Sequence, residues 1–130
     1  MSLHDREERN FSTPFRSPSL SERALMDRLL SANTRGVEAL RIQLASALVR
    51  KIDDNGSLKL NAPSGPKAEI DYSPVPVEME CEDEDGVSIH VLLHVVSGRA
   101  EEIEIYKDDS SEVKRMPAPT EFRIFTPGRP

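Results

Sequence analysis

The sequence predicts an α+β domain in which two N-terminal helices pack on a mainly antiparallel sheet of about five strands. Apolar residues recur at helical spacing only between positions 20 and 47. From position 48 to position 106, apolar residues instead alternate with polar ones, and clusters of Gly, Asn and Asp separate the alternating runs. A block of helices followed by a block of strands is typical of an α+β domain, and 130 residues suffice for one.

The two ends of the chain lack this periodicity. Residues 1–18 mix charged residues, Ser, Pro and two isolated Phe, which predicts an extended or disordered arm. Residues 19–110 are the predicted domain, and residues 111–130 are a Pro-rich tail. In this tail we expect Phe122, Ile124 and Phe125 to form a short added strand or a docking segment.

A capping box marks the start of the first helix. The Ser19 hydroxyl can accept from the Glu22 amide, while the Glu22 carboxylate reaches back to the Ser19 amide. The apolar stripe that follows comprises Leu25, Met26, Leu29 and Leu30. Residues 33–36 end this helix, and the spacing of Val37, Leu40 and Leu44 predicts a second helix from about Gly36 to Ala45.

The longest apolar run, residues 87–106, predicts the central β-hairpin, because Ser97, Gly98 and Arg99 interrupt it. We expect these three residues to form the loop, with Gly98 in a left-handed conformation. The opposed pairs are then Val95 and Glu101, Leu93 and Ile103, Val91 and Ile105, His94 and Glu102, and His90 and Tyr106. This register gathers the apolar residues on one face, whereas a two-residue loop would separate them.

Two further segments complete the predicted sheet. Residues 53–56, which read Asp-Asp-Asn-Gly between apolar runs at 48–52 and 58–60, predict a first hairpin. Residues 75–81 alternate apolar side chains with a proline and glutamates, as a half-buried strand does. The sheet is therefore expected to have five strands in meander-like order.

Charge and cysteine content exclude several classes of function. The net charge is −6, and residues 66–130 carry 7 Lys and Arg against 15 Asp and Glu. An acidic surface repels phosphate backbones, so nucleic-acid binding is not expected. The single cysteine, Cys81, rules out an internal disulfide, and we recognise neither a signal peptide nor a long apolar segment. We expect a cytoplasmic protein without membrane contact.

Four segments carry a resemblance to a known family: SERALMDRLLS, GVEALRIQLASALV, NGSLKL and DEDGVSIHVLLHVVSGRAEEIEIYKDD. Together they resemble a family of small bacterial proteins that carry a domain of unknown function. In that family a helical N-terminal part precedes a D-x-DGV strand, a turn with Gly and an E-I-Y or E-I-W strand. The resemblance covers roughly residues 19–110. It implies an α+β domain with a mainly antiparallel sheet, and it implies no activity.

The two histidines of the central hairpin are candidate metal ligands. On a strand, residues four apart are separated by about 13 Å, so His90 and His94 cannot share one zinc ion. A site would need His94, Glu102 and a third ligand from another strand, and we predict no metal site. Cys81 alternates with buried Val and Met and is expected to be a small core residue. Neither a catalytic residue nor a cofactor is predicted.

The sheet face that carries both histidines is the predicted binding surface. Its candidate residues are His90, Leu92, His94, Glu102, Glu104 and Tyr106. One interpretation is a non-catalytic interaction or regulatory module, immunity-like by analogy, whose acidic or mixed face binds a protein partner or a second copy in a homodimer. The alternative is a small enzyme or ligand-binding protein with a site around His90, His94 and Glu102. A concave pocket would favour the alternative, and a flat face would favour the interaction module.

Overall fold

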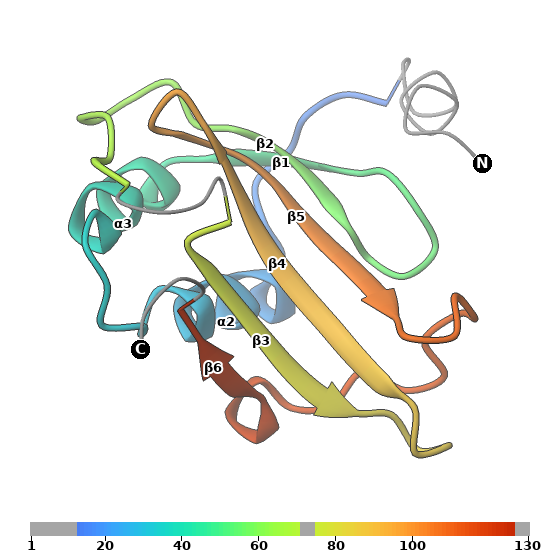
Figure 1. Ribbon diagram of the computed structural model, residues 1–130. Coiled ribbons are helices and arrows are strands. Elements are labelled where there is room, and N and C mark those ends of the chain that lie inside the picture. Colours follow the sequence, from blue (N-terminus) through green and yellow to red (C-terminus); the bar gives the residue numbers. More distant parts are fainter. Residues whose placement is uncertain (1–12, 71–74, 127–130) are drawn as a thin grey trace.

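The computed structural model describes residues 13–70 and 75–126, and within them it confirms the predicted α+β class. Helices α2 (Leu20–Leu29) and α3 (Val37–Ala45) come first and lie on the same side of an antiparallel sheet (Figure 1). The strands are β1 (Leu48–Lys51), β2 (Leu58–Asn61), β3 (Val77–Glu82), β4 (Ser88–Val96), β5 (Arg99–Lys107) and β6 (Arg123–Phe125). A short 3-10 helix, η1 (Pro119–Glu121), precedes β6.

The order of the described strands is β1-β2-β5-β4-β3-β6, so the predicted meander is wrong at one point. β2 pairs with β5 instead of β3, with Leu58 opposite Ile103, and β3 lies on the other side of the central hairpin. Sequence spacing could not show this, because the long connection between β2 and β3 lets β3 reach either edge. The sixth strand is the segment predicted near the C-terminus: β6 pairs with β3, and Phe122 beside it is buried.

Side-chain contacts hold the ends of α2 and α3, and the sequence predicts those at the start of α2. The capping box of α2 is confirmed, with the Glu22 amide 3.2 Å from the Ser19 hydroxyl and the Ser19 amide 2.9 Å from the Glu22 carboxylate. The C-terminal carbonyls of the two helices accept from arginines of the opposite helix. Arg23 donates to Leu44 O at 2.8 Å, and Arg41 donates to Leu30 O through two nitrogens. These bonds satisfy carbonyls that have no partner inside a helix.

Of the predicted arm, residues 1–12 lie outside the described residues. The part that is described runs beside β1, where Arg16 and Val49 form an isolated antiparallel bridge. Arg16 also donates to the Glu22 carboxylate at 2.7 and 2.9 Å, which ties this segment to the first turn of α2. In the predicted tail, residues 127–130 likewise lie outside the described part.

The central hairpin turns through two residues, so the predicted three-residue loop is wrong. Ser97 and Gly98 both have positive φ, as a tight hairpin turn requires, and Val96 pairs with Arg99. A bulge then shifts the register by one residue, so that Val95 faces Ala100 instead of Glu101. The four remaining predicted pairs are confirmed, because the bulge restores the register that a two-residue turn alone would lose. They are His94 with Glu102, Leu93 with Ile103, Val91 with Ile105, and His90 with Tyr106.

The strands bury alternate side chains against the helices. Residues such as Val77, Met79, Val91 and Ile103 join Met26 and Leu40 in one hydrophobic cluster. The alternate side chains point away from α2 and α3, and we call this side of the sheet the outer face.

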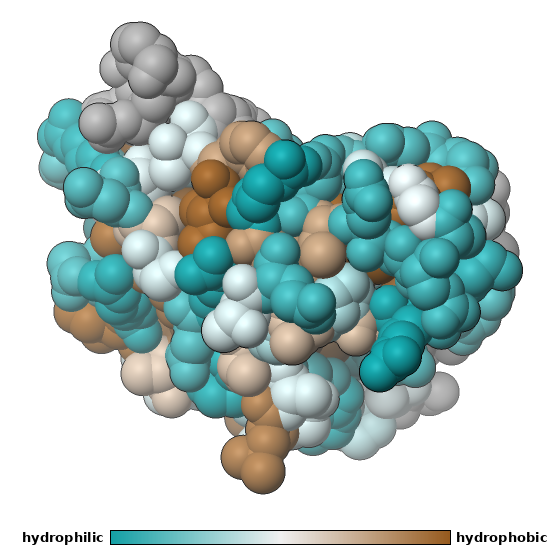
Figure 2. Space-filling view, turned by 90° about the horizontal axis from the view of Figure 1, so that it is seen from below, coloured by the Kyte–Doolittle hydropathy of each residue, from teal (hydrophilic) through white to brown (hydrophobic). Residues whose placement is uncertain are grey.

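The end of the molecule seen in Figure 2 is largely hydrophilic, with hydrophobic residues in separate patches. Among the described helices, none has the length and apolar character needed to cross a membrane.

Candidate functional site

Strand pairing arranges the outer face in rows that run across the sheet. One row contains Arg123, Glu80, His90 and Tyr106. The next contains Phe125, Glu78, Leu92 and Glu104. A third contains His94, Glu102, Lys59 and Arg50. All six predicted binding residues therefore lie on one surface, and each row carries at least one carboxylate at or beside its centre.

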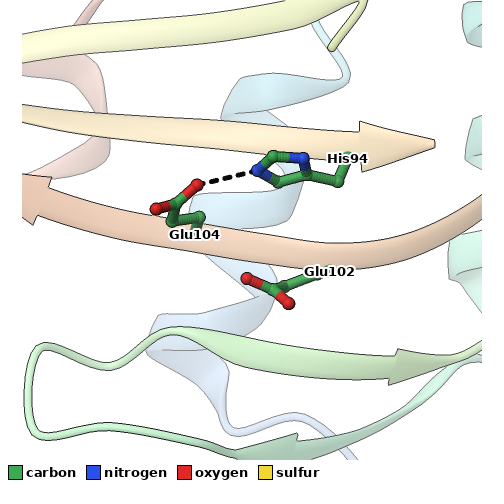
Figure 3. A group of neighbouring side chains, drawn as sticks. All are labelled: His94, Glu102 and Glu104. Carbon is green, nitrogen blue, oxygen red and sulfur yellow. Dashed lines mark hydrogen bonds and ion pairs between the residues drawn. The ribbon is translucent and has the colours of Figure 1, made fainter. Parts of the chain in front are cut away.

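His94, Glu102 and Glu104 form the tightest group on this face (Figure 3). His94 Nε2 lies 2.8 Å from Glu104 Oε1, and one ligand atom from each of the three residues lies within 4.8 Å of the others. The side chains of His94 and Glu104 are each 33% exposed, whereas Glu102 is buried. The group is thus an imidazole with two nearby carboxylates, of which one contacts it, and its side chains are partly open to solvent.

His90 forms a separate group in the first row. Its Nε2 atom lies 2.6 Å from Asp108, its Nδ1 atom lies 3.7 Å from Glu80, and its ring stacks on Tyr106 with centroids 4.9 Å apart. The two carboxylates contact opposite nitrogens of the ring. His90 and His94 therefore belong to different clusters, as the strand spacing predicted.

Several carboxylates surround Tyr106 on the outer face. Burial raises the pKa of Tyr106, and the charges of Glu104, Glu78, Asp108 and Glu80 raise it further. Each carboxylate disfavours the phenolate anion for the same reason that it would favour a bound cation. The shift thus reports an acidic environment over several strands of this face.

Sequence reasoning missed several members of these groups. Lys59 was not considered, although it pairs with Glu102 and its Nζ lies 3.3 Å from Glu101. It was missed because the pairing of β2 with β5 was not predicted. Asp108 was also missed, although it could have been found, since it follows β5 two residues after Tyr106 and therefore on the same face.

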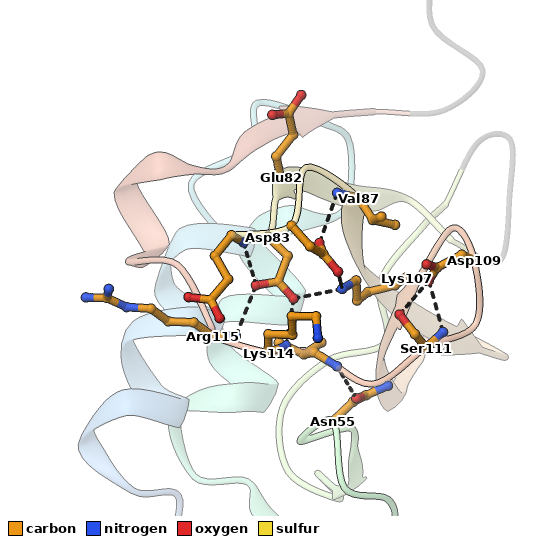
Figure 4. A network of polar contacts seen from close by, with 12 residues as sticks. Asn55, Glu82, Asp83, Val87, Lys107, Asp109, Ser111, Lys114 and Arg115 are labelled. Carbon is orange, nitrogen blue, oxygen red and sulfur yellow. Dashed lines mark hydrogen bonds and ion pairs between the residues drawn. The ribbon is translucent and has the colours of Figure 1, made fainter.

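A second polar cluster lies at the end of the sheet where β5 meets the turn between β3 and β4 (Figure 4). Lys107 Nζ lies 3.0 Å from Asp83 and 2.6 Å from Asp85. Asp83 also accepts from the backbone amides of Glu84, Lys114 and Arg115. This cluster fixes the segment after β5 to the sheet. Its two aspartates belong to the D-x-DGV motif, but the sequence did not pair them with Lys107.

Cys81 lies beside a hollow at this end of the molecule, lined in part by Glu82, Arg115 and Glu121. Burial raises the pKa of the Cys81 thiol, and the charge of Glu121 adds to the effect. A raised pKa leaves little thiolate for nucleophilic attack or metal binding. Cys81 also packs partly against the hydrophobic cluster, which agrees with its predicted core role.

Comparison with known proteins identifies a family and no function. No curated protein matches the chain, and no solved structure matches it. One family model does match, over residues 15–117, which include both described helices and strands β1 to β5. The chain belongs to the family described as a domain of unknown function, DUF6984.

Proposed function

We propose that the protein is a non-catalytic interaction module of the bacterial cytoplasm that binds a basic protein partner through its outer face. One observation carries the proposal. The outer-face positions of β3, β4 and β5 present carboxylates in each row, beside Leu92 and two imidazoles. Complementary charge accelerates the encounter of two proteins and selects between partners.

The outer face also offers apolar surface for a partner to bury. Leu92 lies half-buried at the centre of the second row, and Val96, Tyr106 and Phe125 are 55%, 38% and 42% exposed. These side chains are spread among carboxylates and imidazoles. Protein interfaces that form reversibly have this mixed character, with aromatic and aliphatic side chains between polar groups.

The charge pattern favours a basic partner over a second copy of the chain. In a symmetric dimer whose two-fold axis passes through the middle of this face, the row that carries Glu78 and Glu104 would face an identical row. Like charges opposed in this way weaken association. A basic partner instead meets opposite charge at Glu78 and Glu104, and neutralising such a partner is the action that the analogy with immunity-like proteins describes.

The alternative, a small enzyme or ligand-binding protein with a site around His90, His94 and Glu102, has less support. Two hollows lined by described residues lie away from these histidines, one between α2 and α3 and one beside Cys81. His90 and His94 also contact different carboxylates, those of Asp108 and Glu104, and so belong to separate groups.

A cationic probe tests whether the outer face is the binding surface. An oligolysine peptide is titrated into the isotope-labelled full chain, and the shifts of the backbone amide signals are followed by NMR. We expect the largest shifts in β3, β4 and β5. The double variant Glu78→Lys, Glu104→Lys should weaken binding at least about tenfold, because both charges lie at the centre of the face.

The matched control is Glu84→Lys, Glu112→Lys, which changes the net charge equally at two exposed residues outside the strands. It should bind nearly as the unchanged chain does. Equal weakening in both double variants would show that only net charge matters, and would contradict the proposal. A dimer in light scattering that becomes monomeric in the Glu78→Lys, Glu104→Lys variant would also contradict it, in favour of self-association.

A further inference from the structure

We propose that His94, Glu102 and Glu104 bind one divalent transition-metal ion, for which Zn²⁺ is the best match. The three side chains come from two adjacent strands, His94 from β4 and both glutamates from β5. Glu102 faces His94 directly across the strand pair, and Glu104 lies two residues further along the same face (Figure 3). The metal site shares Glu104 with the proposed protein-binding face, but its test measures metal binding alone and does not depend on a protein partner.

The distances are close to those of a zinc site. Zinc bonds to imidazole nitrogen and carboxylate oxygen at about 2.1 Å, which places tetrahedral ligand atoms about 3.4 Å apart. His94 Nε2 and Glu104 Oε1 are 2.8 Å apart, held by a hydrogen bond whose place a metal ion would take. The Glu102 ligand atom lies within 4.8 Å of the others, so metal binding would require its side chain to move closer.

The ligand set also matches the charge and type of the ion. Two carboxylates supply two negative charges, and a neutral imidazole supplies a nitrogen ligand. Imidazole suits zinc and its neighbours, whereas Mg²⁺ and Ca²⁺ prefer sites made of oxygen alone. Three protein ligands leave one tetrahedral position for water or for a group of a bound molecule. The half-exposed side chains of His94 and Glu104 give the ion access from solvent.

Sequence reasoning rejected a metal site because it required the third ligand to come from another strand. The structure meets the requirement differently, since Glu102 and Glu104 both lie on β5 with ligand atoms within 4.8 Å of that of His94. Residues two apart on a strand share a face, so both carboxylates point to the same side as His94.

His90 provides an internal control for this geometry. It also contacts two carboxylates, those of Asp108 and Glu80, and its side chain is 17% exposed. These carboxylates contact different ring nitrogens, so one ion cannot bind a single nitrogen of His90 together with both of them. If zinc binding depends on His94 and not on His90, the ion is therefore held by ligands that converge on one point. Zinc binding by any surface imidazole would not distinguish the two histidines.

Isothermal titration calorimetry with ZnCl₂ tests the site on the full chain after treatment with a chelator. We expect one ion per chain and no binding of MgCl₂ at the same concentration. The variants His94→Gln and Glu104→Gln should each weaken zinc binding at least about tenfold, since loss of even an indirect partner of a metal ligand costs this much. The variant His90→Gln should change the affinity less than about twofold.

Two controls make the result decisive. Circular dichroism of each variant without metal establishes that it folds, so that loss of binding is not loss of structure. The absorption spectrum with Co²⁺ shows whether Cys81 is a ligand, because thiolate coordination gives a charge-transfer band. The proposal is overturned if zinc does not bind, if His94→Gln binds it unchanged, or if the Co²⁺ spectrum shows thiolate coordination.

Discussion

Two clusters of ionisable side chains, both anchored on β5, differ in how far water reaches them. In the first, at the end of the sheet, the side chains of Lys107 and Asp83 are 0% exposed. In the second, on the outer face, the side chains of His94 and Glu104 are each 33% exposed. Both clusters pair acidic groups with a basic one, so their composition alone does not distinguish them.

The difference in burial goes with a difference in hydrogen bonding. The Asp83 carboxylate accepts from Lys107 and from three backbone amides, at distances between 2.6 and 3.0 Å. His94 and Glu104 share a single hydrogen bond. A buried charge must be fully paired to be tolerated, whereas a half-exposed one can use water. The first cluster is therefore built for stability, and the second retains the capacity to bind something else.

The largest expected effect is the destabilisation caused by Asp83→Ala. This change leaves the Lys107 ammonium with one partner instead of two and leaves the amides of Lys114 and Arg115 without acceptors. We expect the melting temperature to fall by about 10 °C or more, measured by circular dichroism. The exposed neighbour Glu84 is the control, because Glu84→Ala should shift the melting temperature by only about 2 °C. Equal shifts would show that the buried cluster contributes little.

Acid should weaken the same cluster selectively. Burial opposes ionisation of Asp83, but the hydrogen bonds from Lys114, Lys107, Glu84 and Arg115 outweigh it and hold the pKa of its carboxyl well below the usual 3.8. A depressed pKa contributes stability that is present above the unfolded value and is lost as the pH falls through the folded value. Stability should therefore decline below about pH 4, measured by urea unfolding at a series of pH values.

A variant separates this contribution from that of other acidic groups. Arg16 lowers the pKa of Glu22 to about 2, so Glu22 also loses stabilising charge in acid. The variant Asp83→Asn should show a shallower decline below pH 4 than the unchanged chain, because only the Asp83 contribution is removed. An identical decline in both proteins would mean that Asp83 does not titrate abnormally.

The fold was largely predictable because local signals determine most of it. Ser19 and Glu22 marked the start of α2, and the run between residues 87 and 106 identified the central hairpin. The partner of β2 was not predictable, since strand order depends on packing between segments far apart in the chain. The bulge beside Val95 was missed for a different reason, because a turn of two residues plus one bulged residue has the same length as a three-residue loop.

The candidate site was predictable only as a surface. The alternation of β4 and β5 placed His94, Glu102 and Glu104 on one face, which the structure shows. Their convergence depends on side-chain rotamers, and no sequence pattern encodes these. The buried cluster was harder to foresee, because Lys107 continues the inner set of Ile103 and Ile105 at the end of β5, where a lysine is rarely buried. Only the fold reveals that the turn between β3 and β4 covers it with Asp83.

The smallest expected effect on stability is that of the outer-face cluster. Because His94 and Glu104 are half-exposed, His94→Gln or Glu104→Gln should lower the free energy of unfolding by less than about 1 kcal/mol in the absence of metal, measured by urea denaturation. The double variant should show a coupling of the same small size. A loss as large as that of Asp83→Ala would mean that this cluster also serves stability, and the distinction between the two clusters would fail. A small loss would show that the fold does not depend on the arrangement of this imidazole and its two neighbouring carboxylates. That is the expected result for residues that serve binding.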